Sequence, residues 1–219
     1  MRHRDLIAAL LIFSAAFAAF IWIAATVGGA GALTSIDAWA GTWSHLHAMP
    51  QVTQAMIAIS FLGAPSTLTA VTAVACVVLV RKRRYDRLVA LLTLVLGGNL
   101  LNYGLKLLIH RRRPTFDDPL LILPSYSFPS GHAMASTVFY GFVIGYVLTM
   151  TRQRHKAATA AGILLIALIC LSRVYLGVHY VSDVLGGILE AIAWSTLVLT
   201  AMRLARTDQR NSVSRRPAK

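Results

Sequence analysis

Acidic residues are scarce in this chain, which has 8 Asp and Glu among 219 residues against 21 Lys and Arg. Hard divalent cations such as Mg²⁺ depend on carboxylate ligands, yet the only neighbouring acids are Asp117 and Asp118, which we interpret as solvated loop residues. We therefore expect no metal centre and no bound cofactor. An anionic ligand would have to be neutralised by cationic side chains instead.

Charged residues of either sign make up only 13% of the chain, whereas 57% of the residues are hydrophobic and the mean hydropathy is +0.65. This composition excludes an ordinary soluble domain and indicates membrane helices. The chain also has just two cysteines, Cys76 and Cys170, and both lie within apolar runs. We expect them to be small buried hydrophobic side chains, so a disulfide is not predicted.

The apolar residues fall into six runs that predict an all-α, integral membrane six-helix bundle. The runs are about Leu6–Val27, Val52–Val80, Leu88–Ile109, Ser130–Met150, Ala157–Leu171 and Ser182–Met202. We expect one membrane domain over 1–203 and a basic, disordered cytoplasmic tail over 204–219. The alternative for the first run is a signal peptide, but its apolar core of about 22 residues exceeds the usual ~7–15.

Three details of this layout are predicted as well. The second run is expected to break near Gly63-Ala64-Pro65, because proline fits a first helical turn better than an interior. The stretch 28–51 contains Trp39 and Trp43 and predicts an interfacial loop or short helix. Close helix packing is the expected role of four helix glycines, namely Gly141, Gly145, Gly186 and Gly187.

The net charge of +13 could indicate a nucleic-acid partner, but the positions of the cations argue against one. If the N-terminus is cytoplasmic, 16 of the 21 Lys and Arg fall on the inner side. The positive-inside rule then places both termini in the cytoplasm, where the basic segments can contact anionic lipid. Five cations remain outside and need their own explanation: Lys106, Arg111, Arg112, Arg113 and Arg173.

The first of three motifs on that outer side runs from Lys106 to Pro114. Lys106 and Arg113 are seven residues apart, so a continuous helix would present both on one face before Pro114 ends it. The second motif is Pro129-Ser130-Gly131-His132, at the start of the fourth helix. Ser130 can cap this helix, Gly131 allows a ligand to approach the backbone, and the free N–H groups favour an anion.

The third motif is Ser172 to Asp183, where His179 and Asp183 are four residues apart and would share one helix face. A carboxylate that holds one imidazole nitrogen leaves the other free as a nucleophile or base. Arg173 presents a guanidinium fork suited to phosphate oxygens. Each motif alone could be a snorkelling cation, a plain helix cap or a satisfied polar residue. Their occurrence together on one side predicts a phosphate site.

These motifs resemble the signature of the type 2 phosphatidic acid phosphatase family, Lys-x6-Arg-Pro, Pro-Ser-Gly-His and Ser-Arg-x5-His-x3-Asp. The chain matches every position of that signature, and the resemblance extends over about 6–202. It implies a metal-independent lipid phosphatase of the cell (inner) membrane, with its active site on the extracytoplasmic face. Such an enzyme would act on a lipid phosphate partner, and the oligomeric state stays open.

The resemblance also implies a role for each residue of the signature. His179 would attack phosphorus and form a phosphohistidine intermediate while Asp183 holds its ring. His132 would protonate the leaving oxygen and later activate water. The phosphoryl oxygens would be bound by Lys106, Arg113, Ser130, Gly131 and Arg173.

Three further residues are outside the signature. Arg111 and Arg112 either snorkel to headgroups or grip the second phosphate of a diphosphate. Glu190, seven residues beyond Asp183 in the sixth helix, either supports the site or pairs with a polar group.

Candidate substrates are undecaprenyl diphosphate, phosphatidylglycerophosphate and phosphatidate, of which we favour a polyprenyl diphosphate. One alternative is an oxidoreductase like the vanadate-dependent haloperoxidases, which share the signature but are soluble. Another is a phospholipid-binding or transport protein without chemistry. That protein would have no need of His179, Asp183 and His132 together.

Overall fold

The computed structural model describes residues 3–29, 31–116, 124–150 and 155–214, and over these ranges it contains helices and no strand. The helices are α1 (His3–Thr26), α2 (Ala32–Leu46), α3 (Pro50–Phe61), α4 (Pro65–Arg81), α5 (Tyr85–Ile109), α6 (Gly131–Met150), α7 (His155–Tyr175) and α8 (Val181–Ser214). The predicted all-α fold class is confirmed.

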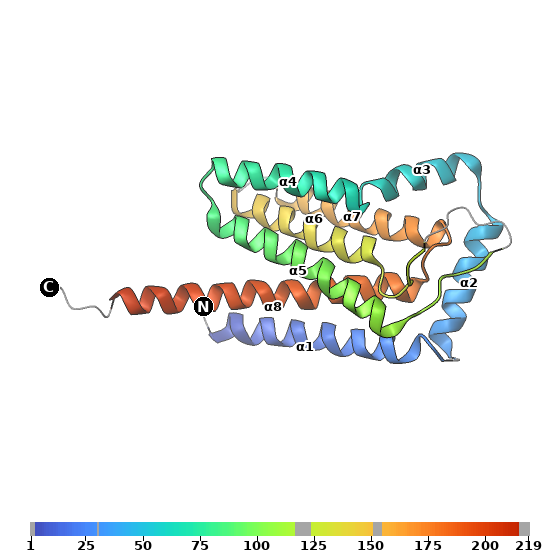
Figure 1. Ribbon diagram of the computed structural model, residues 1–219, viewed down its shortest axis with the longest axis horizontal. Helices are drawn as coiled ribbons and strands as arrows, with labels where there is room; N and C mark the ends of the chain where they lie inside the picture. The colour runs from blue at the N-terminus through green and yellow to red at the C-terminus, as the bar shows by residue number, and fades with distance from the viewer. Residues whose placement is uncertain (1–2, 30, 117–123, 151–154, 215–219) are drawn as a thin grey trace.

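Most of the helices run side by side along the long axis of the molecule (Figure 1). Both termini and the α4–α5 turn lie at one end. At the other, which we call the α2 end, α2 lies across the bundle beside the end of α5, the start of α6 and the α7–α8 turn. The three sequence motifs therefore meet at the α2 end, opposite the termini.

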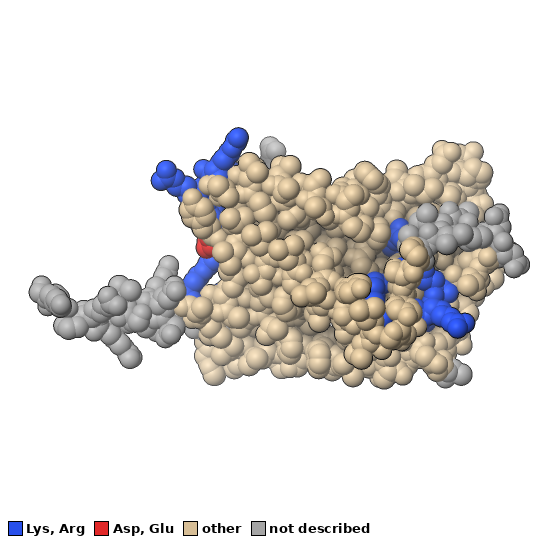
Figure 2. Space-filling view, in the orientation of Figure 1, with Lys and Arg blue, Asp and Glu red and all other residues tan. Residues whose placement is uncertain are grey.

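The bundle has the dimensions and surface of a membrane protein. Five described helices, α1, α5, α6, α7 and α8, are long and apolar enough to cross a membrane, and α3 with α4 passes the same test as a bent pair. Large apolar side chains such as Leu10, Trp22 and Leu96 point outward and are exposed. Figure 2 shows Lys and Arg gathered at the two ends of the visible face, with other residues covering the middle.

The bend between α3 and α4 is 40° and lies at the predicted break. Pro65 is the first residue of α4, where its missing N–H costs no hydrogen bond. A Cβ on Gly63 would lie 2.5 Å from Ile169 Cγ2 and 2.7 Å from Ser136 Oγ. The glycine therefore lets this break approach α6 and α7 closely.

The stretch 28–51 contains the helix α2, with Trp39 and Trp43 exposed and Asp37 almost completely buried. Exposed tryptophans at one end of a membrane bundle fit the predicted interfacial position. The buried Asp37 was not predicted.

One inference about a shared helix face and one predicted helix end were wrong. Helix α5 ends at Ile109, as the apolar run predicts, and His110 takes a left-handed conformation (φ 53°) that stops the helix before Arg113. Lys106 and Arg113 therefore do not share a helix face. At the other end of the molecule α8 continues to Ser214, where a disordered tail was predicted from residue 204. Arg206 bonds Asp86 of α5 at 3.0 Å, which ties this extension to the bundle.

The helix glycines divide into two pairs. A Cβ on Gly186 would lie 2.5 Å from the Phe128 ring, and one on Gly187 would lie 2.5 Å from the Ser130 carbonyl oxygen, so close packing is confirmed there. Gly141 and Gly145 have no atom within 4 Å of such a Cβ, and the packing prediction was wrong for them. Both cysteines are free, as predicted. Asp117 and Asp118 lie outside the described residues.

Candidate active site

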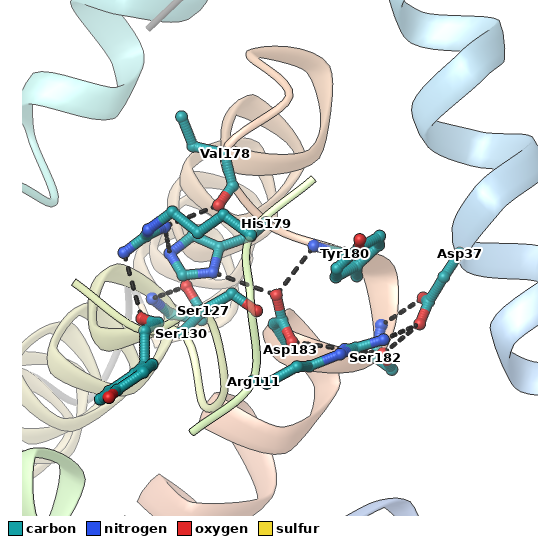
Figure 3. A network of polar contacts seen from close by, with 12 residues as sticks. Asp37, Arg111, Ser127, Ser130, Val178, His179, Tyr180, Ser182 and Asp183 are labelled. Carbon is teal, nitrogen blue, oxygen red and sulfur yellow. Dashed lines mark hydrogen bonds and ion pairs between the residues drawn. The ribbon is translucent and has the colours of Figure 1, made fainter. Parts of the chain in front are cut away.

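The start of α8 holds the His179–Asp183 pair. His179 precedes the helix, which begins at Val181, so the two residues do not share a helix face as predicted. Asp183 Oδ2 accepts the backbone N–H of Tyr180 at 2.9 Å, as an acidic residue in the third helical position does in a capping box. The same oxygen lies 3.3 Å from His179 Nδ1. The helix cap and the histidine contact therefore depend on one carboxylate (Figure 3).

The two neighbours of the His179 ring determine its tautomer. A carboxylate only accepts hydrogen bonds, so Nδ1 carries the proton that faces Asp183. A guanidinium only donates, and Arg113 Nη1 lies 3.2 Å from His179 Nε2. Nε2 is thus the unprotonated nitrogen, and its lone pair faces Arg113. Burial lowers the pKa of His179 from 6.5 to about 4, although Asp183 opposes that shift, so the ring is neutral near pH 7.

Arg113 is held by the loops on both sides of the site. Its Nη1 donates to the Val178 carbonyl oxygen at 2.6 Å, and its Nε donates to the Ser125 carbonyl oxygen at 2.6 Å. Its Nη2 donates to Ser125 Oγ at 2.9 Å. Burial lowers the pKa of Arg113, and Asp183 acts in the opposite direction. The guanidinium is fixed directly beside Nε2 of His179.

A second ion-pair network lies behind Asp183. Arg111 Nη1 donates to Asp183 Oδ1 at 2.5 Å, and Arg111 Nη2 donates to Asp37 Oδ2 at 2.8 Å. Asp37 also accepts the backbone N–H of Ser182 at 2.9 Å and the Ser182 hydroxyl. The Arg111 guanidinium lies 4.1 Å from the centre of the Tyr180 ring. Two buried carboxylates and one arginine thus fix the first turn of α8 (Figure 3).

The start of α6 lies against this turn. Ser130 donates its backbone N–H to the Asp183 carbonyl oxygen at 2.9 Å, and its hydroxyl accepts the N–H of Ala133 at 3.5 Å. Ser130 therefore caps α6 as the sequence predicts. Gly131 is close to Asn102, whose Oδ1 would lie 3.2 Å from an added Cβ. Asn102 in turn donates to Glu190 Oε2 at 2.7 Å, so Glu190 pairs with a polar group.

Arg173 is buried at the end of α7, with 2% of its surface exposed. Its Nη1 donates to Ser60 Oγ of α3. Its Nε and Nη2 are buried without a hydrogen-bond partner in the described part of the chain. A buried guanidinium with unused donors is costly unless an anion completes it.

A cavity of about 490 Å³ connects these groups. Its polar part is lined by Lys106, Arg113, Gly131, His132 and His179. Lys106 Nζ donates to the Tyr126 carbonyl oxygen at 2.7 Å at the rim. Leu68, Val138 and Phe139 are among the apolar residues that line the remainder. The cavity therefore joins a cationic, histidine-containing end to a hydrocarbon-like wall, as an amphipathic phosphate ester requires.

Comparison with known proteins identifies this arrangement. The family model described as the PAP2 superfamily matches residues 87–206, more than half of the chain. The chain belongs to the PAP2 superfamily. It is therefore a membrane phosphatase, and hydrolysis without a metal ion is general for this superfamily. The membrane-length helices argue against the haloperoxidase-like alternative, whose members are soluble, and the similarity to phosphatases over most of the chain argues against the non-catalytic one.

Individual PAP2 relatives agree. Phosphatidylglycerophosphatase B of Bacillus subtilis is 34% identical over 177 residues, 78% of this chain and 85% of that protein. The crystal structure of a transmembrane PAP2 type phosphatidylglycerolphosphate phosphatase from Bacillus subtilis superposes with a TM-score of 0.80 and 31% identity, covering 87% of this chain and 96% of that one. Aquifex aeolicus LpxE shares the fold, with a TM-score of 0.58, 22% identity, and 73% and 92% coverage. Mouse sphingosine-1-phosphate phosphatase 2 is 36% identical over 87 residues, 38% of this chain and 23% of that protein.

Within this PAP2 site, the sequence prediction for Arg111 fails. Both terminal nitrogens of Arg111 are bound to buried aspartates and its side chain is only 10% exposed, so it neither snorkels nor is free to grip a second phosphate. Arg112 is exposed and lines a separate cavity with Lys106 and Arg113, so its prediction stands.

Sequence reasoning missed Asp37, Ser182 and Ser60. Asp37 and Ser60 lie before the region matched by the family model, and no local spacing connects them to the motifs. The one available signal for Asp37 was an acid within a tryptophan-containing interfacial segment, in a chain with few acids.

Proposed function

We propose that this protein hydrolyses the phosphate monoester of a membrane lipid through a phosphohistidine on His179. The observation that carries the proposal is the position of the His179 ring between Asp183 and Arg113. That position leaves a neutral Nε2 lone pair beside a fixed guanidinium. Nε2 attacks phosphorus, the bond to the leaving oxygen breaks, and Asp183 stabilises the positive charge that develops on the ring.

In this proposal His132 is the general acid. It lines the same cavity as His179 and would give its proton to the leaving lipid oxygen. In the second step it would take a proton from the water that attacks the phosphohistidine, which releases phosphate and regenerates His179. Lys106, Arg113 and Arg173, with Ser130 and the Gly131 backbone, would bind the phosphoryl oxygens as charge spreads over them.

The free donors of Arg173 support its place in that set. Its Nε and Nη2 are buried in the described structure and make no hydrogen bond there. A phosphoryl group presents two oxygens that a guanidinium fork can bind with two parallel hydrogen bonds. Ser60 would hold the third nitrogen and orient the fork.

Among lipids, we propose a glycerophospholipid monoester such as phosphatidylglycerophosphate. Two relatives that match most of this chain carry that substrate in their names. The engagement of Arg111 with Asp37 and Asp183 also removes half of the residue-level support for a diphosphate. A polyprenyl diphosphate stays a second candidate through Arg112, which is exposed beside Lys106 and Arg113.

We further propose that Asp37 and Arg111 are positioning residues for the nucleophile. They do not contact the cavity, but Arg111 fixes Oδ1 of Asp183 while Oδ2 faces His179. Holding the carboxylate at both oxygens keeps the imidazole in one orientation, and catalysis is sensitive to displacements of about 1 Å.

For the membrane arrangement we propose six spans in the cell (inner) membrane, with α3 and α4 as one bent span. Both termini would be cytoplasmic and the site extracytoplasmic. The support is that 16 of 21 Lys and Arg belong to the termini and the two basic segments, while the site is at the opposite end in Figure 1.

A rapid quench in alkaline denaturant tests the proposal. The purified protein is mixed in chelator with a lipid monoester labelled on its phosphorus, and protein-bound label is measured within one turnover. Acid-labile, alkali-stable label is expected in the native chain, and its loss is expected in His179→Ala. If the lipid is hydrolysed within one turnover and no label is bound to the protein at any time, the phosphohistidine intermediate is contradicted.

A further inference from the structure

A second groove lies in the half of the bundle that is distant from the active site. It has a volume of about 480 Å³ and lies between α5, α6 and α8. Leu94, Phe142 and Leu199 are among its apolar walls. Gly141 and Gly145 line it too, and the space above both is open within 4 Å of where a Cβ would be. These two glycines therefore shape a surface channel.

Three arginines line the same groove at its end nearest the termini: Arg87 of α5 and Arg203 and Arg206 of α8. Arg206 Nη2 lies 3.0 Å and Arg87 Nε lies 3.8 Å from the same oxygen of Asp86. Two guanidinium groups from different helices thus converge on one carboxylate oxygen. Arg87 also lies over the Tyr146 ring, 5.9 Å from its centre. Arg203 lines the groove beside this pair.

We propose that this groove is a binding site for an anionic phospholipid of the leaflet opposite the active site. One acyl chain would lie in the channel over Gly141 and Gly145. The phosphodiester would sit among Arg87, Arg203 and Arg206, at the depth where Asp86 already brings two guanidiniums together. Basic pockets between membrane helices bind lipid headgroups by this combination of charge and hydrocarbon contact. The site is independent of the catalytic reaction, because a phosphodiester is not a monoester substrate.

A second copy of the chain is a weaker explanation for the groove. A glycine pair four residues apart is a common helix-dimerisation surface, and a partner helix could fill the channel. It would bring little negative charge to the three arginines, since the chain has only 8 acids among 219 residues. Charge complementarity favours the lipid.

The test is a lipid titration of the full chain in detergent micelles, read by native mass spectrometry. Phosphatidylglycerol is compared with phosphatidylcholine of identical acyl chains. One phosphatidylglycerol should bind at least tenfold more tightly than phosphatidylcholine. Arg203→Gln with Arg206→Gln should weaken it by about fivefold for each arginine removed, whereas Arg81→Gln, at an exposed cation on the same end, should not.

A steric pair of variants tests the channel itself. Gly145→Leu should fill the groove and abolish tight binding, and Gly104→Leu is its matched control, since Gly104 also has open space but lies outside the groove. All four variants should keep hydrolytic activity, which shows that they fold. Equal affinity for the two lipids, or unchanged binding in the arginine or Gly145 variants, would overturn the proposal. Loss of binding only in Arg113→Gln would also overturn it, because the lipid would then lie in the catalytic cavity. A dimer that Gly145→Leu breaks without affecting lipid binding would overturn it as well.

Discussion

Two opposing influences act on the His179 ring. Burial disfavours the charged imidazolium, and Asp183 favours it, but burial is the larger and the pKa falls from 6.5 to about 4. The folded protein binds this proton only near pH 4, whereas the unfolded chain binds it near pH 6.5. The folded state therefore loses stability as the pH falls from about 6.5 to about 4. Above it the ring is neutral, which is the form that a nucleophile needs.

This pKa can be measured directly. In the protein labelled with ¹⁵N-histidine, the His179 ring signals should titrate with a midpoint near pH 4, because the buried ring resists the proton. The signals are assigned by their disappearance in His179→Asn. A His179 midpoint near 6.5 would mean that solvent reaches the ring and that burial does not control its charge.

The two histidines should differ in their dependence on the leaving group. His132→Ala should keep most of the first-step rate with nitrophenyl phosphate, whose leaving group needs no proton, and should lose about 10²–10⁴-fold with a lipid monoester. His179→Ala should be inactive with both. Single-turnover rates on the two substrates provide the measurement. An equal loss for both variants on both substrates would refute the assigned roles.

Arg112 determines whether a diphosphate is a plausible substrate. If its exposed guanidinium binds the second phosphate, Arg112→Gln should cost roughly 1.5–3 kcal/mol with a polyprenyl diphosphate, about tenfold to a hundredfold in kcat/KM. The matching monophosphate should be nearly unaffected. Arg112→Lys, which keeps the charge but not the fork, should be intermediate. The same loss on both substrates would leave the diphosphate candidate without support from any residue.

At the scale of elements, α2 contributes to the site without touching the cavity. Asp37 crosses from α2 to bind Arg111 and the first turn of α8. Replacing one partner of a buried ion pair leaves the other uncompensated, so Asp37→Asn should lower the free energy of unfolding by about 3–5 kcal/mol. Because Asp183 then loses its fixed position, kcat should fall by about 10²-fold with little change in KM.

A fall in kcat per folded molecule with an unchanged KM distinguishes a positioning role from a general loss of folded protein. Ser44→Ala, at another buried polar residue of α2, should change neither parameter. Asp37→Glu should recover part of kcat, since it restores the charge to Arg111. If Asp37→Asn destabilises the protein while kcat is unchanged, Asp37 is purely structural.

The same elements show what the sequence could and could not predict. Apolar runs and the Gly63–Pro65 break locate the helices, because hydrophobicity and proline geometry act locally. Five signature residues line one cavity because they are near helix ends on one side: Lys106, Arg113, Gly131, His132 and His179. The direction of Arg111 could not be predicted. It depends on the left-handed conformation of His110 at the end of α5 and on Asp37, which is 74 residues away from Arg111 along the chain.

For the whole molecule, the distribution of charge predicts the direction of insertion. The site and the basic α4–α5 turn lie at opposite ends of the bundle, as Figures 1 and 2 show. Lys and Arg resist transfer across the membrane, so the end with most of them should stay in the cytoplasm. Of the five cations at the other end, Arg173 is buried, Lys106 and Arg113 line the site, Arg111 is bound to two aspartates, and Arg112 is exposed.

Cysteine labelling tests this orientation in intact cells. Thr115→Cys, beside the site, and Lys82→Cys, in the α4–α5 turn, are introduced separately into a chain whose Cys76 and Cys170 are replaced by alanine; both positions are exposed. An impermeant maleimide should label position 115 in whole cells and position 82 only after permeabilisation. Activity of the two variants confirms that they insert correctly. The reverse pattern would place the active site in the cytoplasm, and the substrate would then have to be presented from the inner leaflet.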